Sequence, residues 1–295
     1  MTFSATEAAF EGFRVVRRHP LAILFWALAY AVFFAGFFGL FAGPLATVMA
    51  TTESLEGTQP SPQEMQALMA SWSGFMVLAL PLSLVLGAVL NTAVARSVLR
   101  PADKAFGYLR LGADELRVLA VSLLLGIIFF AATVILFVIV GVLAGVAGQV
   151  NAGVGILVGV LVGLGAAAAL VWLAVRLSLA VPITFHEKRI ALFDSFTMTK
   201  GHFLALLGMA VIAVIMSILV SVLGTIIALP ITLATGGLDQ LATMDGQSTA
   251  QILQAAGPGL MAWGVVNALF SALQLAVIYA PFSAAYRDLK DLPHE

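Results

Sequence analysis

Residue types that could carry out chemistry inside a membrane are nearly absent from this chain. Intramembrane proteolysis needs a serine paired with a membrane histidine, or two membrane aspartates, and none of the long apolar stretches contains His, Asp or Glu. His186-Glu187 lacks the second histidine of the zinc-binding HExxH pattern. The chain also has no cysteine, which excludes thiol catalysis, thiolate metal sites and disulfide bonds. We therefore predict a protein that is not an enzyme, with no catalytic residue, metal or cofactor.

One polar cluster in the second half of the chain could still serve a lipid enzyme. It combines two histidines with two acidic residues, which are His186, Glu187, Asp194 and His202. Three basic residues surround the cluster, namely Lys188, Arg189 and Lys200. An anion-binding patch explains this mixture of charges more simply than an active site does, and we prefer that interpretation.

Polar side chains follow one helical face in three of the apolar stretches. They are Ser83, Asn91, Ser217, Ser221, Thr225, Asn267, Ser271 and Gln274. In lipid such groups must face protein or water, because each unsatisfied polar group is costly. Hydrogen bonding between packed helices is the interpretation we prefer. A cavity lined by the second, fifth and sixth stretches is the alternative, favoured by prolines that would kink the same three stretches.

Small residues recur every four positions in the fourth apolar stretch. They are Gly155, Gly159, Gly163 and Ala167. This spacing places them on one helical face, where small side chains let helix backbones approach closely in lipid. We predict that this face packs against another helix, either in the same chain or in a second copy.

These side chains must be positioned by six apolar stretches, each long enough for a bilayer core, which needs about 20 residues. The stretches cover residues 21–43, 74–95, 119–145, 155–175, 203–233 and 260–286. Hydrophobic residues make up 61% of the chain and charged residues only 10%, against roughly 25% in soluble domains. This composition excludes a soluble enzyme, a nucleic-acid-binding protein and a disordered segment. We predict an all-α polytopic membrane protein, with residues 1–295 forming a single membrane domain.

The basic residues are confined to alternate connections between these stretches. All 14 Lys and Arg lie within residues 14–18, 96–117, 176–200 and 287–290. The remaining connections carry acidic residues without basic ones, namely Glu53, Glu56, Glu64, Asp239 and Asp245. Because basic connections stay in the cytoplasm, we expect both termini to be cytoplasmic. The first stretch is longer than the apolar region of a signal peptide, about 7–15 residues, so we expect it to be retained.

The basic segments that precede the first, third and fifth stretches contain a similar short pattern, which indicates a threefold internal repeat. The patterns are Ala9-Phe10-x-x-Phe13-Arg14, Ala105-Phe106-x-x-Leu109-Arg110 and Leu192-Phe193-x-x-Phe196-Thr197. Apolar residues at positions i and i+3 mark one face of a helix. We therefore predict three helical hairpins, each preceded by a short cytoplasmic amphipathic helix at about 5–18, 103–112 and 189–199. The corresponding units are about 1–100, 101–182 and 183–295.

The third unit contains Ser195-Phe196-x-Met198-Thr199-Lys200-Gly201-His202-Phe203, preceded by Arg176, Pro182 and Glu187. This stretch resembles a bacterial six-span family that includes uncharacterised inner-membrane proteins and the membrane domain fused to some glycerophosphodiester phosphodiesterases. The family usually has Trp where Phe196 stands and often Asn where His202 stands. No phosphodiesterase catalytic domain is present in this chain. The resemblance covers about a tenth of the chain closely and implies a location in the bacterial inner membrane, without implying an activity.

The basic residues and neighbouring phenylalanines lead to a functional prediction. Anionic lipids attract Lys and Arg at the cytoplasmic surface, and amphipathic helices insert apolar faces among headgroups. We expect binding to membrane lipids, particularly anionic phospholipids, or to partner membrane proteins, and no binding to nucleic acid. The candidate headgroup-binding residues are Arg14, Arg17, Arg18, Arg100, Arg110, Lys188, Arg189, Lys200 and His202. Two alternatives remain: these charges only orient the spans, or the protein is an uncoupled permease or lipid translocator using the polar cavity.

Overall fold

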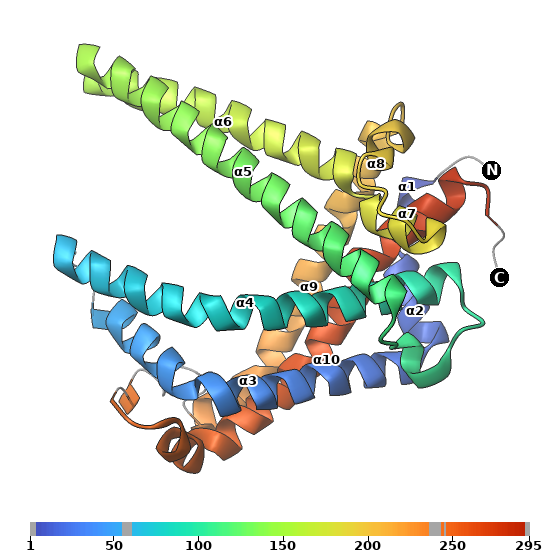
Figure 1. Cartoon of the computed structure of the whole chain (residues 1–295), viewed down its shortest axis with the longest axis horizontal. Helices are drawn as coiled ribbons and strands as arrows, with labels where there is room; N and C mark the ends of the chain where they lie inside the picture. The colour runs from blue at the N-terminus through green and yellow to red at the C-terminus, as the bar shows by residue number, and fades with distance from the viewer. Residues whose placement is uncertain (1–3, 55–60, 236–242, 245, 293–295) are drawn as a thin grey trace.

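The computed structural model describes residues 4–54, 61–235, 243–244 and 246–292, which form helices and no β-strand (Figure 1). Six of the helices are long and apolar enough to cross a membrane. They are α3 (Pro20–Ser54), α4 (Pro62–Leu99), α5 (Ala113–Val150), α6 (Ala152–Leu177), α9 (Phe203–Thr235) and α10 (Thr249–Leu289). The predicted all-α fold with six spans is confirmed, and the chain is a multi-pass membrane protein.

Polar caps extend two of these helices beyond the predicted apolar stretches. At the start of α4 the Ser61 hydroxyl accepts a hydrogen bond from the Glu64 backbone N–H at 3.3 Å. The Glu64 carboxylate in turn accepts from the Ser61 backbone N–H at 2.8 Å. Ser248 and Gln251 form the same capping box before α10. Such boxes satisfy the free N–H groups of a first helical turn, so the two helices begin well before residues 74 and 260.

Helix α10 lies at the centre of the bundle and packs against α2, α3, α4 and α9. Its buried face contains an alanine at every fourth position. These residues are Ala268, Ala272, Ala276, Ala280 and Ala284. Their small side chains let several neighbouring helices approach α10 closely. Helix α3 packs more extensively on α10 than on α4, its neighbour in sequence, so the first and last spans are joined in the fold.

Helices α5 and α6 form an antiparallel pair that packs mainly on itself. In Figure 1 the pair diverges from α3 and α4 as it extends away from the α7 and α8 end. Most of its side chains beyond that end are exposed on the protein surface. The small-residue face of α6 contributes to this pairing, because a Cβ atom at Gly155 would lie only 2.7 Å from the Gly148 Cα of α5.

The short helices gather at one end of the bundle, which we call the polar end (Figure 1). They are α1 (Ala5–Ala9), α2 (Glu11–Arg18), the 3-10 turn η1 (Ala105–Tyr108), α7 (Ala180–Glu187) and α8 (Asp194–Met198). The adjoining ends of the long helices complete this region. The helix expected over 5–18 is broken at Phe10, and the helix expected over 189–199 is limited to α8.

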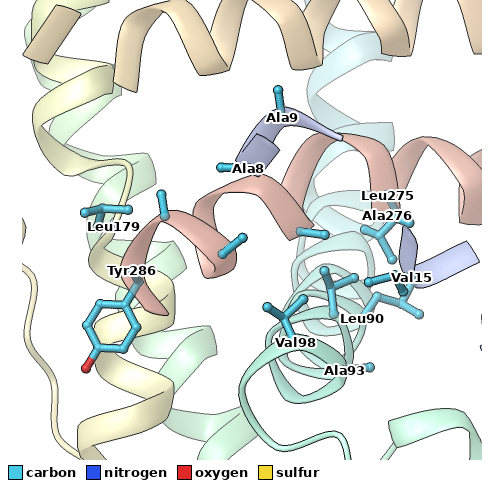
Figure 2. Close-up of a cluster of buried hydrophobic side chains, with 14 of the residues drawn as sticks. Ala8, Ala9, Val15, Leu90, Ala93, Val98, Leu179, Leu275, Ala276 and Tyr286 are labelled. Atoms are coloured by element: carbon cyan, nitrogen blue, oxygen red, sulfur yellow. The ribbon is translucent and has the colours of Figure 1, made fainter. Parts of the chain in front are cut away.

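The largest hydrophobic core lies next to the polar end (Figure 2). Ala8 and Ala9 of α1 contribute to it, as do side chains of α2, α4 and α10. A Cβ atom at Gly12 would lie 2.5 Å from the Val277 Cα, so α2 rests directly on the backbone of α10. Close packing therefore holds the short N-terminal helices against the spans rather than leaving them free on the surface.

Candidate functional site

Arginines at the ends of three spans hold the segments of the polar end in place. Arg96 on α4 donates to the backbone of η1, and Arg176 on α6 donates to the Phe196 carbonyl of α8 at 3.3 Å. A nitrogen of Arg287 on α10 lies 3.7 Å from a carboxylate oxygen of Glu11 on α2. Each arginine therefore joins the last turns of a span to a different short helix, and none of the three was among the predicted headgroup-binding residues.

The most buried of these contacts is the ion pair between Arg96 and Glu115. An Nη of Arg96 lies 2.5 Å from a carboxylate oxygen of Glu115, and the two side chains are only 3% and 6% exposed. The guanidinium also lies 5.4 Å from the centroid of the Phe185 ring. Charges buried to this degree must be paired, because an unpaired charge in the interior is strongly destabilising. The pair therefore ties α4 to the start of α5.

The turn η1 replaces the helix predicted over 103–112. Phe106, Gly107 and Tyr108 have φ values of 51°, 64° and 67°, a left-handed conformation that costs roughly 1–2 kcal/mol for each non-glycine residue. Two distant side chains hold it: Trp26 Nε1 donates to the Gly107 carbonyl at 2.7 Å, and Arg96 donates to the Tyr108 carbonyl. The turn leaves the Phe106 side chain 75% exposed. Strained backbone that is held by such contacts often has a functional role.

Four of the predicted headgroup-binding arginines lie in ion pairs. The pairs are Arg14–Glu11 (2.9 Å), Arg100–Asp114 (3.5 Å), Arg110–Asp103 (3.4 Å) and Arg189–Glu187 (2.6 Å), with Asp194 also bound to Arg189. The hydrogen bonds that the Arg189 guanidinium donates to the carboxylates of Asp194 and Glu187 raise the pKa of Arg189. Because each arginine has an acidic partner within the protein, its charge is partly compensated before any external anion approaches.

Other basic side chains at the polar end are exposed and make no ion pair with any described residue. They are Arg17, Arg18, Lys104, Lys188 and Lys200. Sequence reasoning did not single out Lys104. Exposed apolar side chains are their neighbours in sequence, including Phe106 beside Lys104 and the 68% exposed Phe193 that follows Lys188. His202, the remaining predicted residue, is exposed immediately before α9.

A cleft of about 410 Å³ opens at the polar end between α2, α4 and α10. Arg18, His19 and Arg287 contribute to its lining. Burial lowers the pKa of His19, and the positive charges of Arg18 and Lys104 lower it further. The lining therefore carries positive charge from Arg18 and Arg287, together with the negative charge of Glu11, whose carboxylate lies beside Arg287.

Six of the eight polar side chains predicted in the apolar stretches line a cavity, but they are divided between two separate cavities. A cavity of about 340 Å³ between α9 and α10 is lined by Ser221, Thr225, Asn267, Ser271 and Gln274. Asn91 lines a second cavity, while Ser83 is exposed on α4. Gln274 Nε2 donates to the carbonyl of the buried Ser217 at 3.5 Å, which joins α10 to α9. Asn267 instead donates to a carbonyl of its own helix.

The small residues of α6 differ in what they contact. Gly155 packs on the α5 backbone, and a Cβ atom at Gly159 would lie 3.3 Å from Ala144. A Cβ atom at Gly163 would have no neighbour within 4 Å, and Ala167 is exposed. The stretch therefore packs within the chain only near the connection between α5 and α6.

Among the described residues, no group of three or more His, Asp or Glu side chains could hold a metal ion. No known family model, curated protein or solved structure matches this chain. The resemblance of residues 195–203 to a six-span bacterial family therefore stays a prediction, and function must be argued from the geometry of the polar end.

Proposed function

We propose that this protein is a non-enzymatic protein of the bacterial cytoplasmic membrane that holds anionic phospholipid headgroups at its polar end. The observation that carries the proposal is that exposed basic side chains without an ion pair lie close in sequence to exposed aromatic side chains. Lys104 stands beside Phe106, and Lys188 precedes Phe193 by a few residues. A lysine can contact a phosphate group while a neighbouring phenylalanine enters the apolar edge of the headgroup layer.

The charge distribution supports a cytoplasmic polar end. Every Lys and Arg of the chain lies in the segments that form this end. Glu53 near the end of α3 and Glu64 in the first turn of α4 lie at the opposite end, while Glu56, Asp239 and Asp245 fall outside the described residues. Loops rich in basic residues remain in the cytoplasm, and the inner leaflet carries a negative surface potential. Both termini would then be cytoplasmic.

The construction of η1 supports a contact surface rather than a simple connection. Its left-handed backbone is unfavourable for Phe106 and Tyr108, and contacts from α3 and α4 keep it in place. A connection that only joined two spans would gain nothing from exposing Phe106 to water. In contact with a membrane, the same side chain would bury its apolar surface, at about 25 cal/mol per Å².

The test compares unpaired with paired basic residues. One variant carries Lys104→Gln, Lys188→Gln and Lys200→Gln, and its matched control carries Arg14→Gln, Arg110→Gln and Arg189→Gln. Both lose three positive charges, so their net charges are equal. Native mass spectrometry would measure retention of dioleoylphosphatidylglycerol and dioleoylphosphatidylcholine by each purified protein.

A lysine near an anionic surface contributes roughly 1 kcal/mol, and about 1.4 kcal/mol corresponds to a tenfold change in affinity. We expect the lysine variant to lose at least tenfold in retention of phosphatidylglycerol, and the arginine control to lose less. Equal retention by wild type and both variants, with unchanged topology, would mean that the basic residues serve only to orient the spans.

A second candidate, an uncoupled translocator, has one supporting observation. Five of the predicted cavity residues line the 340 Å³ cavity between α9 and α10. Coupled transporters usually hold an ionisable residue within the membrane, and the apolar stretches contain none, so any transport would be passive. A lipid-scrambling assay in vesicles, with Ser271→Leu to fill the cavity, would test this candidate.

A further inference from the structure

We propose that the cavity around Asn91 binds a neutral membrane lipid whose headgroup carries a free hydroxyl, such as a monoacylglycerol or a long-chain alcohol. The cavity has a volume of about 420 Å³ and is bordered by α4, α5, α6, α7 and α10. This volume falls within the usual range for ligand pockets, roughly 300–1,000 Å³. The site is separate from the basic residues of the polar end and does not depend on their binding of anionic lipid.

Three polar side chains around this cavity have unused hydrogen-bonding capacity. The Oδ1 atom of Asn91 has no hydrogen-bond partner and almost no accessible surface, so its amide must turn toward the cavity before a ligand can reach this atom. Within the described part of the chain, the hydroxyls of Tyr279 and Ser283 also form no hydrogen bond. The Ser178 hydroxyl differs, because it donates to the Val175 carbonyl at 2.8 Å. A buried polar atom without a partner costs roughly 1–3 kcal/mol, so a ligand that supplies the partner would be favoured by that contact.

The remaining walls of the cavity suit an apolar chain. Leu125 and Phe129 of α5 lie on one side, and Val181 and Phe282 of α7 and α10 complete the lining. The cavity reaches the protein surface at Tyr279, which is 42% exposed, and at Ala174. Both positions lie on long apolar helices, so a lipid could enter from the bilayer without crossing water. The exposed apolar side chains of α5 could then contact the rest of its acyl chain.

The lining of the cavity favours a neutral headgroup that can donate a hydrogen bond. No charged side chain is among the lining residues, so a phosphate, carboxylate or ammonium group would be desolvated without compensation. The Oδ1 atom of Asn91 accepts hydrogen bonds and cannot donate them. A carboxylate or a methyl ester has no hydrogen to give it, whereas a hydroxyl can donate to Asn91 and accept from Tyr279 or Ser283.

The experiment uses the full-length protein in lipid nanodiscs and three probes with the same acyl chain. These are 1-oleoylglycerol, methyl oleate and oleate, and native mass spectrometry measures retention of each. Asn91→Leu removes the amide, and Ser83→Leu on the same helix is its matched control, because Ser83 lies outside the cavity. Ala174→Trp provides a second variant, which fills the entrance and leaves Asn91, Tyr279 and Ser283 intact.

We expect wild type and Ser83→Leu to retain 1-oleoylglycerol at least tenfold more than methyl oleate or oleate. Asn91→Leu and Ala174→Trp should each lose that preference. Equal retention of all three probes by wild type would overturn the proposal. So would failure to retain any probe, which would indicate a cavity filled by water alone. If Asn91→Leu does not fold, retention of 1-oleoylglycerol by a folded Ala174→Trp protein would contradict the proposal by itself.

Discussion

Arg96 and Arg100 extend from neighbouring turns at the end of α4, yet their surroundings differ. The Arg96 side chain is buried against Glu115, whereas that of Arg100 is 27% exposed and lies 3.5 Å from Asp114. Both guanidinium groups approach the Phe185 ring, at 5.4 Å and 4.6 Å from its centroid. Full burial makes Arg96 part of the folded framework, while Arg100 keeps access to the surface.

This difference predicts the effect of removing one member of the buried pair. Arg96→Met or Glu115→Gln should each lower the free energy of unfolding by roughly 3–5 kcal/mol, because the partner is left buried and uncompensated. The double variant should lose less than the sum of the two single changes. Thermal unfolding in detergent would measure this, with Arg110→Gln as a surface control. A loss below about 1 kcal/mol for both single variants would show that the pair is not structural.

His19 provides a prediction for pH dependence. Its pKa is lowered from the ordinary value of 6.5, mainly by burial and then by Arg18 and Lys104. The unfolded chain therefore binds a proton more readily than the folded protein. The stability that neutral His19 contributes is present above pH 6.5 and is lost as the pH falls through its lowered pKa. Between pH 7 and pH 5, wild type should lose more thermal stability than His19→Gln, and equal losses would contradict this assignment.

The sequence was enough to predict which end of the bundle holds the basic residues, but not which acidic partner each of them has. Hydropathy and the alternation of charge were enough to place Arg96 and Lys188 at the same end of the bundle. Whether each was paired depended on contacts such as that between Arg96 and Glu115, which exist only once the turn between α4 and α5 has formed. The sequence showed no feature that distinguished the paired Arg189 from the unpaired Lys188 beside it.

At the scale of elements, contact between backbones positions α2. The absence of a side chain at Gly12 lets α2 lie against Val277 of α10, where an added Cβ atom would be 2.5 Å from a main-chain carbon. Main-chain atoms cannot rotate away as a side chain can. The short helix is therefore fixed by the shape of its neighbour, and Arg287 adds its charged contact to Glu11 at the same junction.

We expect Gly12→Ala to lower the free energy of unfolding by roughly 1–3 kcal/mol, as overpacking does elsewhere. Gly208→Ala in α9 is a matched control, because a Cβ atom there would have no neighbour within 4 Å. That control should be neutral or stabilising by about 0.4–1 kcal/mol, since alanine restricts the unfolded chain. Thermal unfolding of both variants would check the pair, and a stabilising Gly12→Ala would show that α2 does not rest on α10.

Long elements were predicted better than short ones, for a physical reason. A span is determined by its own hydrophobicity, so all six could be found from the chain alone. The pattern around Phe106 resembled that around Phe10, but it forms a left-handed turn rather than a helix. That turn depends on Trp26 and Arg96, which are distant in sequence. Gly107 was the only local signal, because glycine accepts a positive φ readily.

At the scale of the whole molecule, one end carries the basic residues and the other carries none. This asymmetry predicts a single orientation in the membrane, with the polar end in the cytoplasm. Reporter fusions after Gln63 and Gly246 should report the outer compartment, and a fusion after Gly201 should report the cytoplasm. A cytoplasmic signal at Gly246 would contradict the orientation.

A fluorescent label at Phe193 would show whether the polar end contacts anionic lipid. Because the chain contains no cysteine, Phe193→Cys provides a unique site for an environment-sensitive fluorophore. The labelled protein would be reconstituted in vesicles that contain phosphatidylglycerol and phosphatidylcholine in equal fractions. In one sample the phosphatidylglycerol is brominated, and in the other the phosphatidylcholine. We expect stronger quenching by the phosphatidylglycerol, because unpaired lysines concentrate that lipid around the label. Equal quenching by the two lipids, or no quenching by either, would contradict it.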